Sequence, residues 1–185
     1  DVCSSDLNAG VPVVGRRLSP GELEPALRRL GLAGADVVDG LPARVVSTGL
    51  PYLIVPVVPD ALAKAAIQGT DFESVLGAIG AKFVLVLDVE AREMRTWDNL
   101  GRVEDVATGS AAGPAAAFLR GAGLADPSSP TVLAQGRFVG RPSRIDVVHD
   151  ADGSLRVSGD VWPVSRGFLD VDVNRMAPPA DSRPR

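Results

Sequence analysis

The chain has 185 residues, with 19 lysines and arginines against 23 aspartates and glutamates, for a net charge of -4. This length suits one main domain with a substantial core. The basic residues are scattered along the chain, which argues against nucleic acid as a partner. The longest apolar run, at residues 52–58, is far shorter than the roughly 20 residues of a membrane span. We therefore expect a soluble, cytoplasmic protein that binds neither nucleic acid nor membrane.

The two ends of the chain are expected to lie outside the folded part. Residues 1–7 are what results from translating GAC GTG TGC TCT TCC GAT CT, which resembles the end of a common sequencing adapter. The alternative is a natural disordered end. We favour the adapter, expect further natural sequence upstream, and set these residues aside. They contain Cys3, the single cysteine, so a disulfide framework or a structural zinc site is excluded. Residues 177–185 are expected to be a disordered tail.

The first predicted helix begins after Ser19. Pro20 suits the first helical position, and Glu22 completes a capping box with Ser19. Apolar residues then recur at helical spacing, and Gly31 ends the helix. The apolar stripe consists of Leu23, Ala26, Leu27 and Leu30.

A segment with two strands and two short helices is predicted next. The strands, at 45–47 and 52–58, are joined by a turn that contains glycine and proline. The helices are expected at 61–67 and 72–79, and Asp71 is placed to cap the second.

The middle of the chain combines a buried strand with an unusual helix. Residues 83–87 are continuously apolar, which predicts a strand buried on both faces, and another strand is expected at 92–97. A helix follows from about Ser110, because Pro114 is tolerated only in the first turn. This helix is apolar on every side, which indicates that it is enclosed by a sheet. Residues 121–123, Gly-Ala-Gly, end it.

The remainder is expected to consist of strands and turns. Residues 150–153, Asp-Ala-Asp-Gly, predict a hairpin turn. The expected strands are 131–133, 137–139, 145–148, 155–157 and 168–173.

The start of the apolar helix is where the residues themselves suggest chemistry. Residues 104–113 place two carboxylates before a turn of small residues. Thr108 or Ser110 can cap the helix with a side-chain oxygen, while Gly109 lets a ligand approach the unpaired N–H groups of the first turn. The sequence therefore predicts an anion site here.

Three segments carry a family resemblance by their order and spacing. They are Glu104-Asp105-x-Ala-Thr-Gly-Ser-Ala-Ala-Gly, Gln135-Gly136-x-x-x-Gly140-Arg141-Pro142-Ser143 and Val157-Ser158-Gly159. Together they resemble the phenazine-biosynthesis PhzF-like family, which shares the diaminopimelate epimerase fold. The resemblance covers the C-terminal half of such a protein.

The resemblance implies an α+β fold for residues 8–176. This would be one lobe of a two-lobed protein, in which a curved mixed β-sheet wraps around a central apolar helix. It also implies isomerisation or epimerisation of a small acidic metabolite in the cleft between the lobes, by proton transfer next to an acidifying group. No cofactor or metal is expected, and a homodimer is implied.

The resemblance also assigns roles at the helix start. Asp105 would be the catalytic residue that handles or orients a proton, while Thr108, Gly109 and Ser110 would bind the substrate. Physics alone leaves Asp105 open between this role and that of a helix-start anion. The family's main proton-transferring glutamate and its Gly-His-Pro or Gly-Asn-Pro turn belong to the absent N-terminal lobe. We therefore expect an active full-length parent and an inactive fragment.

Two hypotheses from other classes stay open. The chain could be a single-lobed, non-catalytic module that binds a small carboxylate or phosphate at residues 108–110, or a purely structural domain in which this turn only caps the helix. For Arg137 and Arg141 we favour a surface strand pair over a substrate-carboxylate site. His149 is interpreted as a residue flanking a loop, and Glu73 as a surface charge.

Overall fold

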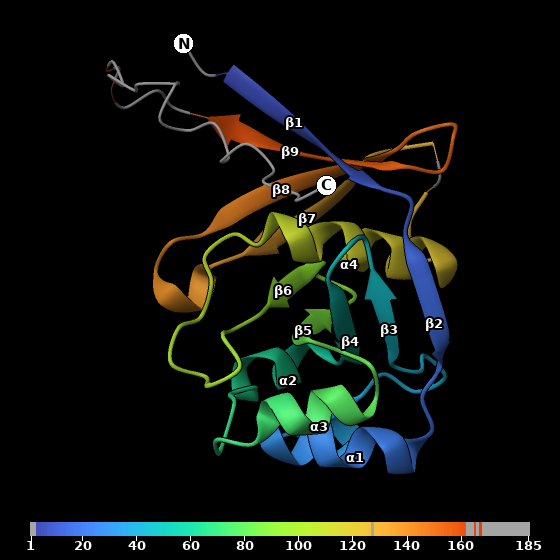
Figure 1. Cartoon of the computed structure of the whole chain (residues 1–185), viewed down its shortest axis with the longest axis vertical. Helices are drawn as coiled ribbons and strands as arrows, with labels where there is room; N and C mark the ends of the chain where they lie inside the picture. The colour runs from blue at the N-terminus through green and yellow to red at the C-terminus, as the bar shows by residue number, and fades with distance from the viewer. Residues whose placement is uncertain (1–2, 127, 162–164, 166, 168–185) are drawn as a thin grey trace, which may run out of the picture.

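The fold is built on one curled, mixed β-sheet. The computed structural model describes residues 3–126, 128–161, 165 and 167. Nine strands follow the order β1-β9-β8-β7-β6-β5-β4-β3-β2 across the sheet (Figure 1). The β4–β5 and β6–β7 pairs are parallel and the other pairs are antiparallel. The strands are β1 (Cys3–Gly10), β2 (Val13–Arg17), β3 (Arg44–Ser47), β4 (Pro51–Val57), β5 (Phe83–Asp88), β6 (Glu93–Arg95), β7 (Thr131–Gln135), β8 (Ser143–His149) and β9 (Leu155–Val161).

Four α-helices pack on this sheet, three at one end and one between strands. Figure 1 shows α1, α2 and α3 together, with α4 between β7–β9 and the strands β3–β5. The sheet and helices together confirm the expected α+β class and the curved mixed sheet. The helices are α1 (Pro20–Arg29), α2 (Pro59–Lys64), α3 (Phe72–Ala78) and α4 (Gly109–Gly121).

Strand β5 separates two hydrophobic cores. Val84 and Val86 belong to the core shared with α1, α2 and α3. Leu85 and Leu87 belong to the core shared with α4. Successive side chains of a strand point to opposite faces, so this alternation confirms the prediction of a strand buried on both sides.

Helix α4 is enclosed by strands. Residues 111–119 are all buried, and the helix contacts β3, β4, β5, β7, β8 and β9. The small side chains permit this close approach: a Cβ added to Gly113 would already lie 3.4 Å from the Thr48 side chain and 3.5 Å from Leu155. Because the helix has no polar face, it is buried along its length and reaches the surface at its ends.

The start of α1 follows the sequence prediction. The Ser19 N–H donates to Glu22 Oε2 at 2.9 Å, and the Glu22 N–H donates to Ser19 Oγ at 3.4 Å. This capping box satisfies two backbone groups that the helix leaves unpaired. The apolar stripe from Leu23 to Leu30 is buried, as expected, and Gly31 takes a left-handed conformation with φ of 67° after the helix.

Two local predictions are wrong. Asp71 occupies the N-cap position of α3, but its side chain does not cap the helix, because its carboxylate instead pairs with Arg29 at 2.7 Å. Residues 137–139 form a 3₁₀ turn (Arg137–Val139) in place of a strand. The flanking Gly136 and Gly140 have φ of 83° and 70°, left-handed values that interrupt an extended chain.

The two edge strands of the sheet were not expected from the sequence. Strand β1 pairs antiparallel with β9, with Cys3 opposite Val161 and Gly10 opposite Leu155. Strand β2 pairs with β3. The expected strand at 168–173 and the expected tail at 177–185 lie outside the described residues. Among the described residues, no helix has the length and apolar character needed to cross a membrane.

The capping box of α1 gives a first test of the fold. Ser19→Ala removes one of its hydrogen bonds and should lower the free energy of unfolding by about 1 kcal/mol, measured by urea denaturation. Ser74→Ala, at an exposed position in the first turn of α3, is the matched control and should change it little. Equal losses in the two variants would contradict the capping role.

Candidate functional site

The candidate site is reached through a tight reversal of the chain after β6. The Asp98 carboxylate accepts hydrogen bonds from the backbone N–H groups of Arg102 and Val103 at 2.7 and 2.8 Å. The chain then returns beside its own path, and the Asp105 N–H donates to the Thr96 carbonyl at 3.0 Å. This reversal positions Asp105 just before α4.

Glu104 is held in a nearly buried ion pair. Arg95 donates to both Glu104 oxygens, at 2.9 and 2.6 Å, and each side chain is only 9% exposed. The same guanidinium donates to the carbonyls of Leu62 and Ala65 and lies over the ring of Trp97. The two adjacent carboxylates of the motif are therefore distinct: Glu104 is occupied by the interior, whereas Asp105 is exposed.

The hydroxyls at the start of α4 do not cap the helix. The Thr108 hydroxyl donates to Asp105 Oδ2 at 2.6 Å, and the Ser110 hydroxyl bonds to the Tyr52 hydroxyl at 2.9 Å. The predicted capping is thus wrong, because a charged acceptor and a buried phenol engage these groups instead. Among the described residues, no hydrogen-bond acceptor is recorded for the N–H groups of Gly109 and Ser110. These two donors, at the positive end of the helix, suit an anion.

Gln135 fixes the loop between Asp105 and Thr108. This side chain, at the end of β7, is only 1% exposed. Its Oε1 accepts from the Thr108 N–H at 2.9 Å, while its Nε2 donates to the Asp105 carbonyl and to Thr108 Oγ1, both at 2.9 Å. Gln135 belongs to the second family motif, but the sequence alone indicated no role for it at the site.

Other residues of the 135–143 motif pack against the same loop, residues 105–108. A Cβ at Gly136 would lie 2.7 Å from the Val106 carbonyl oxygen and 2.2 Å from that of Arg141, so only glycine fits. The Ser143 hydroxyl donates to the Val106 carbonyl at 2.8 Å. The second motif therefore supports the first across about thirty residues of sequence.

Tyr52 connects Ser110 to the electrostatics of the site. Burial raises the pKa of the Tyr52 phenol, its hydrogen bond with Ser110 lowers it, and the negative charge of Asp105 raises it. The net direction is upward, so the phenol stays protonated at neutral pH. Tyr52 of β4 is therefore coupled electrostatically to Asp105 in the loop and by a hydrogen bond to Ser110 at the start of α4.

Comparison with known proteins identifies the family of the chain. The family model described as phenazine biosynthesis-like protein matches residues 6–167. The chain belongs to this family. None of the curated proteins compared with the chain is a significant match.

Solved structures of this family resemble the chain over most of its length. A "predicted epimerase" from Pseudomonas aeruginosa is 47% identical, with a TM-score of 0.83, over 91% of this chain and 59% of that protein. A PhzF-family phenazine biosynthesis protein from Bacillus anthracis is 22% identical, with a TM-score of 0.67, over 86% of this chain and 61% of that protein. The chain thus spans about three fifths of the length of these relatives.

Other residues singled out in the sequence have local partners. Arg137 lies in the 3₁₀ turn, so Arg137 and Arg141 do not form the expected strand pair, and the Arg137 side chain donates to Glu93 at 2.7 Å. His149 ends β8, and burial together with Arg120 lowers its pKa. Glu73 is exposed on α3, as expected. Within the part of the chain that the structure describes, no group of His, Cys, Asp or Glu side chains is arranged to hold a metal ion.

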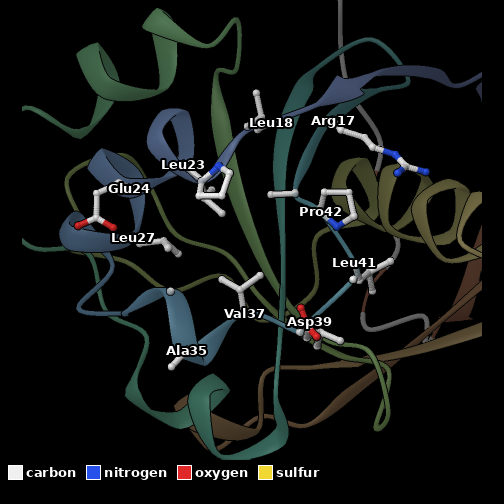
Figure 2. Close-up of a pocket in the computed structure, with 15 residues that line it drawn as sticks. Arg17, Leu18, Leu23, Glu24, Leu27, Ala35, Val37, Asp39, Leu41 and Pro42 are labelled. Atoms are coloured by element: carbon white, nitrogen blue, oxygen red, sulfur yellow. The ribbon is translucent and has the colours of Figure 1, made fainter.

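An open pocket lined by both apolar and charged residues lies elsewhere in the fold. It has a volume of about 680 Å³ and lies between α1 and residues 34–43, with Leu23, Leu27 and Val37 among its lining residues (Figure 2). None of the predicted site residues lines it. The start of α4 remains the candidate site, because an exposed carboxylate lies there close in sequence to two N–H donors that have no acceptor among the described residues.

The Arg95–Glu104 pair predicts a large stability effect. Glu104→Ala leaves the Arg95 charge unpaired in the interior and should lower the free energy of unfolding by about 3 kcal/mol, measured by chemical denaturation. Asp146→Ala removes an exposed pair with Arg144 and should have a much smaller effect. Similar losses in the two variants would contradict a structural role for Glu104.

Tyr52 is the only tyrosine of the chain, so its titration can be followed by phenolate absorbance alone. It should titrate above about pH 10, the usual value. Asp105→Asn should lower the midpoint, because it removes a negative charge that disfavours phenolate. Asp60→Asn, exposed on α2, should leave the midpoint unchanged. Circular dichroism at each pH verifies folding, and a midpoint insensitive to Asp105→Asn would contradict the geometry.

Proposed function

We propose that this chain forms one lobe of an isomerase or epimerase that moves a proton on a small acidic metabolite without a cofactor. In this proposal, Asp105 handles or orients the proton, and Gly109 and Ser110 bind the substrate directly. Thr108 belongs to the same substrate-binding turn and contributes by holding it in place, because its N–H and hydroxyl are bonded to Gln135 and Asp105. The observation that carries it is an exposed carboxylate held at the start of α4, beside two N–H donors that have no acceptor among the described residues. Membership of the family and the 47% identical "predicted epimerase" support it.

The local chemistry suits removal of a proton from carbon. Such a reaction needs a positioned base and donors that stabilise the negative charge developing beside the reacting carbon. Asp105 is exposed, and the Thr108 hydroxyl bonds to its Oδ2, so Oδ1 is the oxygen proposed to act on the substrate. The N–H groups of Gly109 and Ser110, with the Ser110 hydroxyl, supply donors. The N-terminal end of α4 adds a favourable potential for an acidic substrate.

A second lobe is part of the proposal. Isomerisation also requires delivery of a proton to another position or face, often by a second group. About two fifths of the length of each relative lies outside the matched part, and Asp105 is open to solvent. We propose that another lobe covers Asp105 and supplies that group, and that this chain alone has no turnover.

Deuterium exchange can test the proposal. The chain would be assayed alone and with the part of the Pseudomonas aeruginosa relative that it does not match, supplied as a separate or fused lobe. Small hydroxy and amino carboxylic acids would be screened by proton NMR for incorporation of solvent deuterium at carbon. We expect exchange with the combined lobes only. Asp105→Asn should reduce it by about a hundredfold or more, whereas Asp60→Asn should preserve it.

Other outcomes separate the alternatives. Exchange by the chain alone, abolished by Asp105→Asn, would show that no second lobe is needed. Saturable binding of these acids without exchange, weakened by Ser110→Ala, would favour a non-catalytic binding module. Loss of stability in Ser110→Ala with neither binding nor exchange in any sample would favour a structural domain.

A further inference from the structure

Two hydroxyls at the start of α4 are each bonded to a buried side chain from the sheet. Gln135 of β7 reaches Thr108, and Tyr52 of β4 reaches Ser110. Gln135 and Tyr52 are only 1% and 3% exposed. Neither has a role in the proposed chemistry, yet each is the buried partner of a residue that does.

The partners of Gln135 determine which way its amide is turned. Its Oε1 faces the Thr108 N–H, which can only donate, and its Nε2 faces the Asp105 carbonyl, which can only accept. If the amide were turned, its oxygen would face the Asp105 carbonyl oxygen, and its NH2 group would face the Thr108 N–H. Nε2 is therefore also the donor to Thr108 Oγ1. With its oxygen already accepting, the Thr108 hydroxyl directs its own proton to Asp105 Oδ2, at 2.6 Å.

The direction at Ser110 follows from the burial of Tyr52. Ser110 Oγ is the hydrogen-bond partner of the Tyr52 hydroxyl among the described residues. If Ser110 donated this bond, the phenol proton of the 3% exposed Tyr52 would have no acceptor among the described residues, which is costly. The phenol therefore donates, and the Ser110 proton is free to point outward. Ser110 is exposed, so this proton faces the proposed substrate side.

We infer that Gln135 and Tyr52 are positioning residues that set the proton directions at the site. Gln135 acts through Thr108, so that Asp105 is presented as an acceptor. Tyr52 acts through Ser110, so that its hydroxyl is presented as a donor beside the two free N–H groups. The inference rests on the proposed function and sharpens its substrate class: an acidic C–H toward Asp105, and an anionic oxygen toward Ser110.

Neutron diffraction from deuterated crystals of this chain tests the proton directions without any substrate. We expect deuterium on Gln135 Nε2 toward Thr108 Oγ1, on Thr108 toward Asp105 Oδ2, and on Tyr52 toward Ser110 Oγ. The Ser110 deuterium should point away from Tyr52. Deuterium on Thr108 directed at Gln135, or on Ser110 directed at Tyr52, would overturn the inference whether or not the protein is an isomerase.

The roles of the two residues are tested kinetically in the combined two-lobe protein. Gln135→Glu replaces the donor by an acceptor, so the Thr108 hydroxyl turns from Asp105; kcat for deuterium exchange should fall by up to about a hundredfold with little change in KM. Gln68→Glu, the same change at an exposed position, is the control. Tyr52→Phe frees the Ser110 hydroxyl from its fixed direction and should raise KM by about fivefold.

Thr108 variants keep the test valid if Gln135→Glu does not fold. Thr108→Val removes the bond to Asp105 without burying a charge and should lower kcat, whereas Thr108→Ser should restore it. If every variant lowered kcat and raised KM together, in proportion to its loss of thermal stability, Gln135 and Tyr52 would have only a structural role. Absence of exchange in the unmodified combined protein would overturn the proposed function, while the neutron result would still decide the proton directions.

Discussion

The burial of α4 is the constraint on which this structure depends. Residues 111–119 are apolar on all sides, so the helix is stable only where strands surround it. The curled sheet meets this requirement with strands from both halves of the chain. Small residues such as Gly113 let strands approach closely. The polar groups of α4 then meet solvent at its ends, and its N-terminal end becomes the chemically distinctive position of the fold.

The surroundings of that helix start separate two neighbouring carboxylates. Glu104 is neutralised by Arg95 in the interior, which anchors the chain before the site. Asp105 keeps an exposed carboxylate, bonded by Thr108 and close enough to Tyr52 to raise its pKa. Buried polar contacts from the sheet, above all those of Gln135, hold this loop in place. The arrangement combines a rigid support with an open, charged face, as a proposed proton-transfer site requires.

Local patterns in the sequence were sufficient for the elements whose causes are local. The capping box of Ser19 and the double-faced burial of β5 were predicted correctly, and residues 111–119 of α4 are buried, as their apolar composition indicates. The turn at residues 137–139 was missed, because left-handed glycines on both sides override a strand-like composition. The edge strands β1 and β2 were missed: residues 1–7 were set aside, and the short β2 has no buried face.

The buried residues that hold the site in place were harder to predict from the sequence, because they act through tertiary contacts. Gln135 lies 27 positions from Thr108, and Tyr52 lies 58 positions from Ser110. The helix start itself was predicted from its composition and family motif. The use of its hydroxyls was not, because the competing partners of Thr108 and Ser110 become visible only when the strands come together.

The most direct test of this account is the rate of solvent deuterium incorporation into a small acidic substrate by the combined two-lobe protein, compared before and after Asp105→Asn. The account predicts exchange that needs both lobes and that this single substitution nearly abolishes. Undiminished exchange in the Asp105→Asn protein would contradict the assignment of proton transfer to the start of α4.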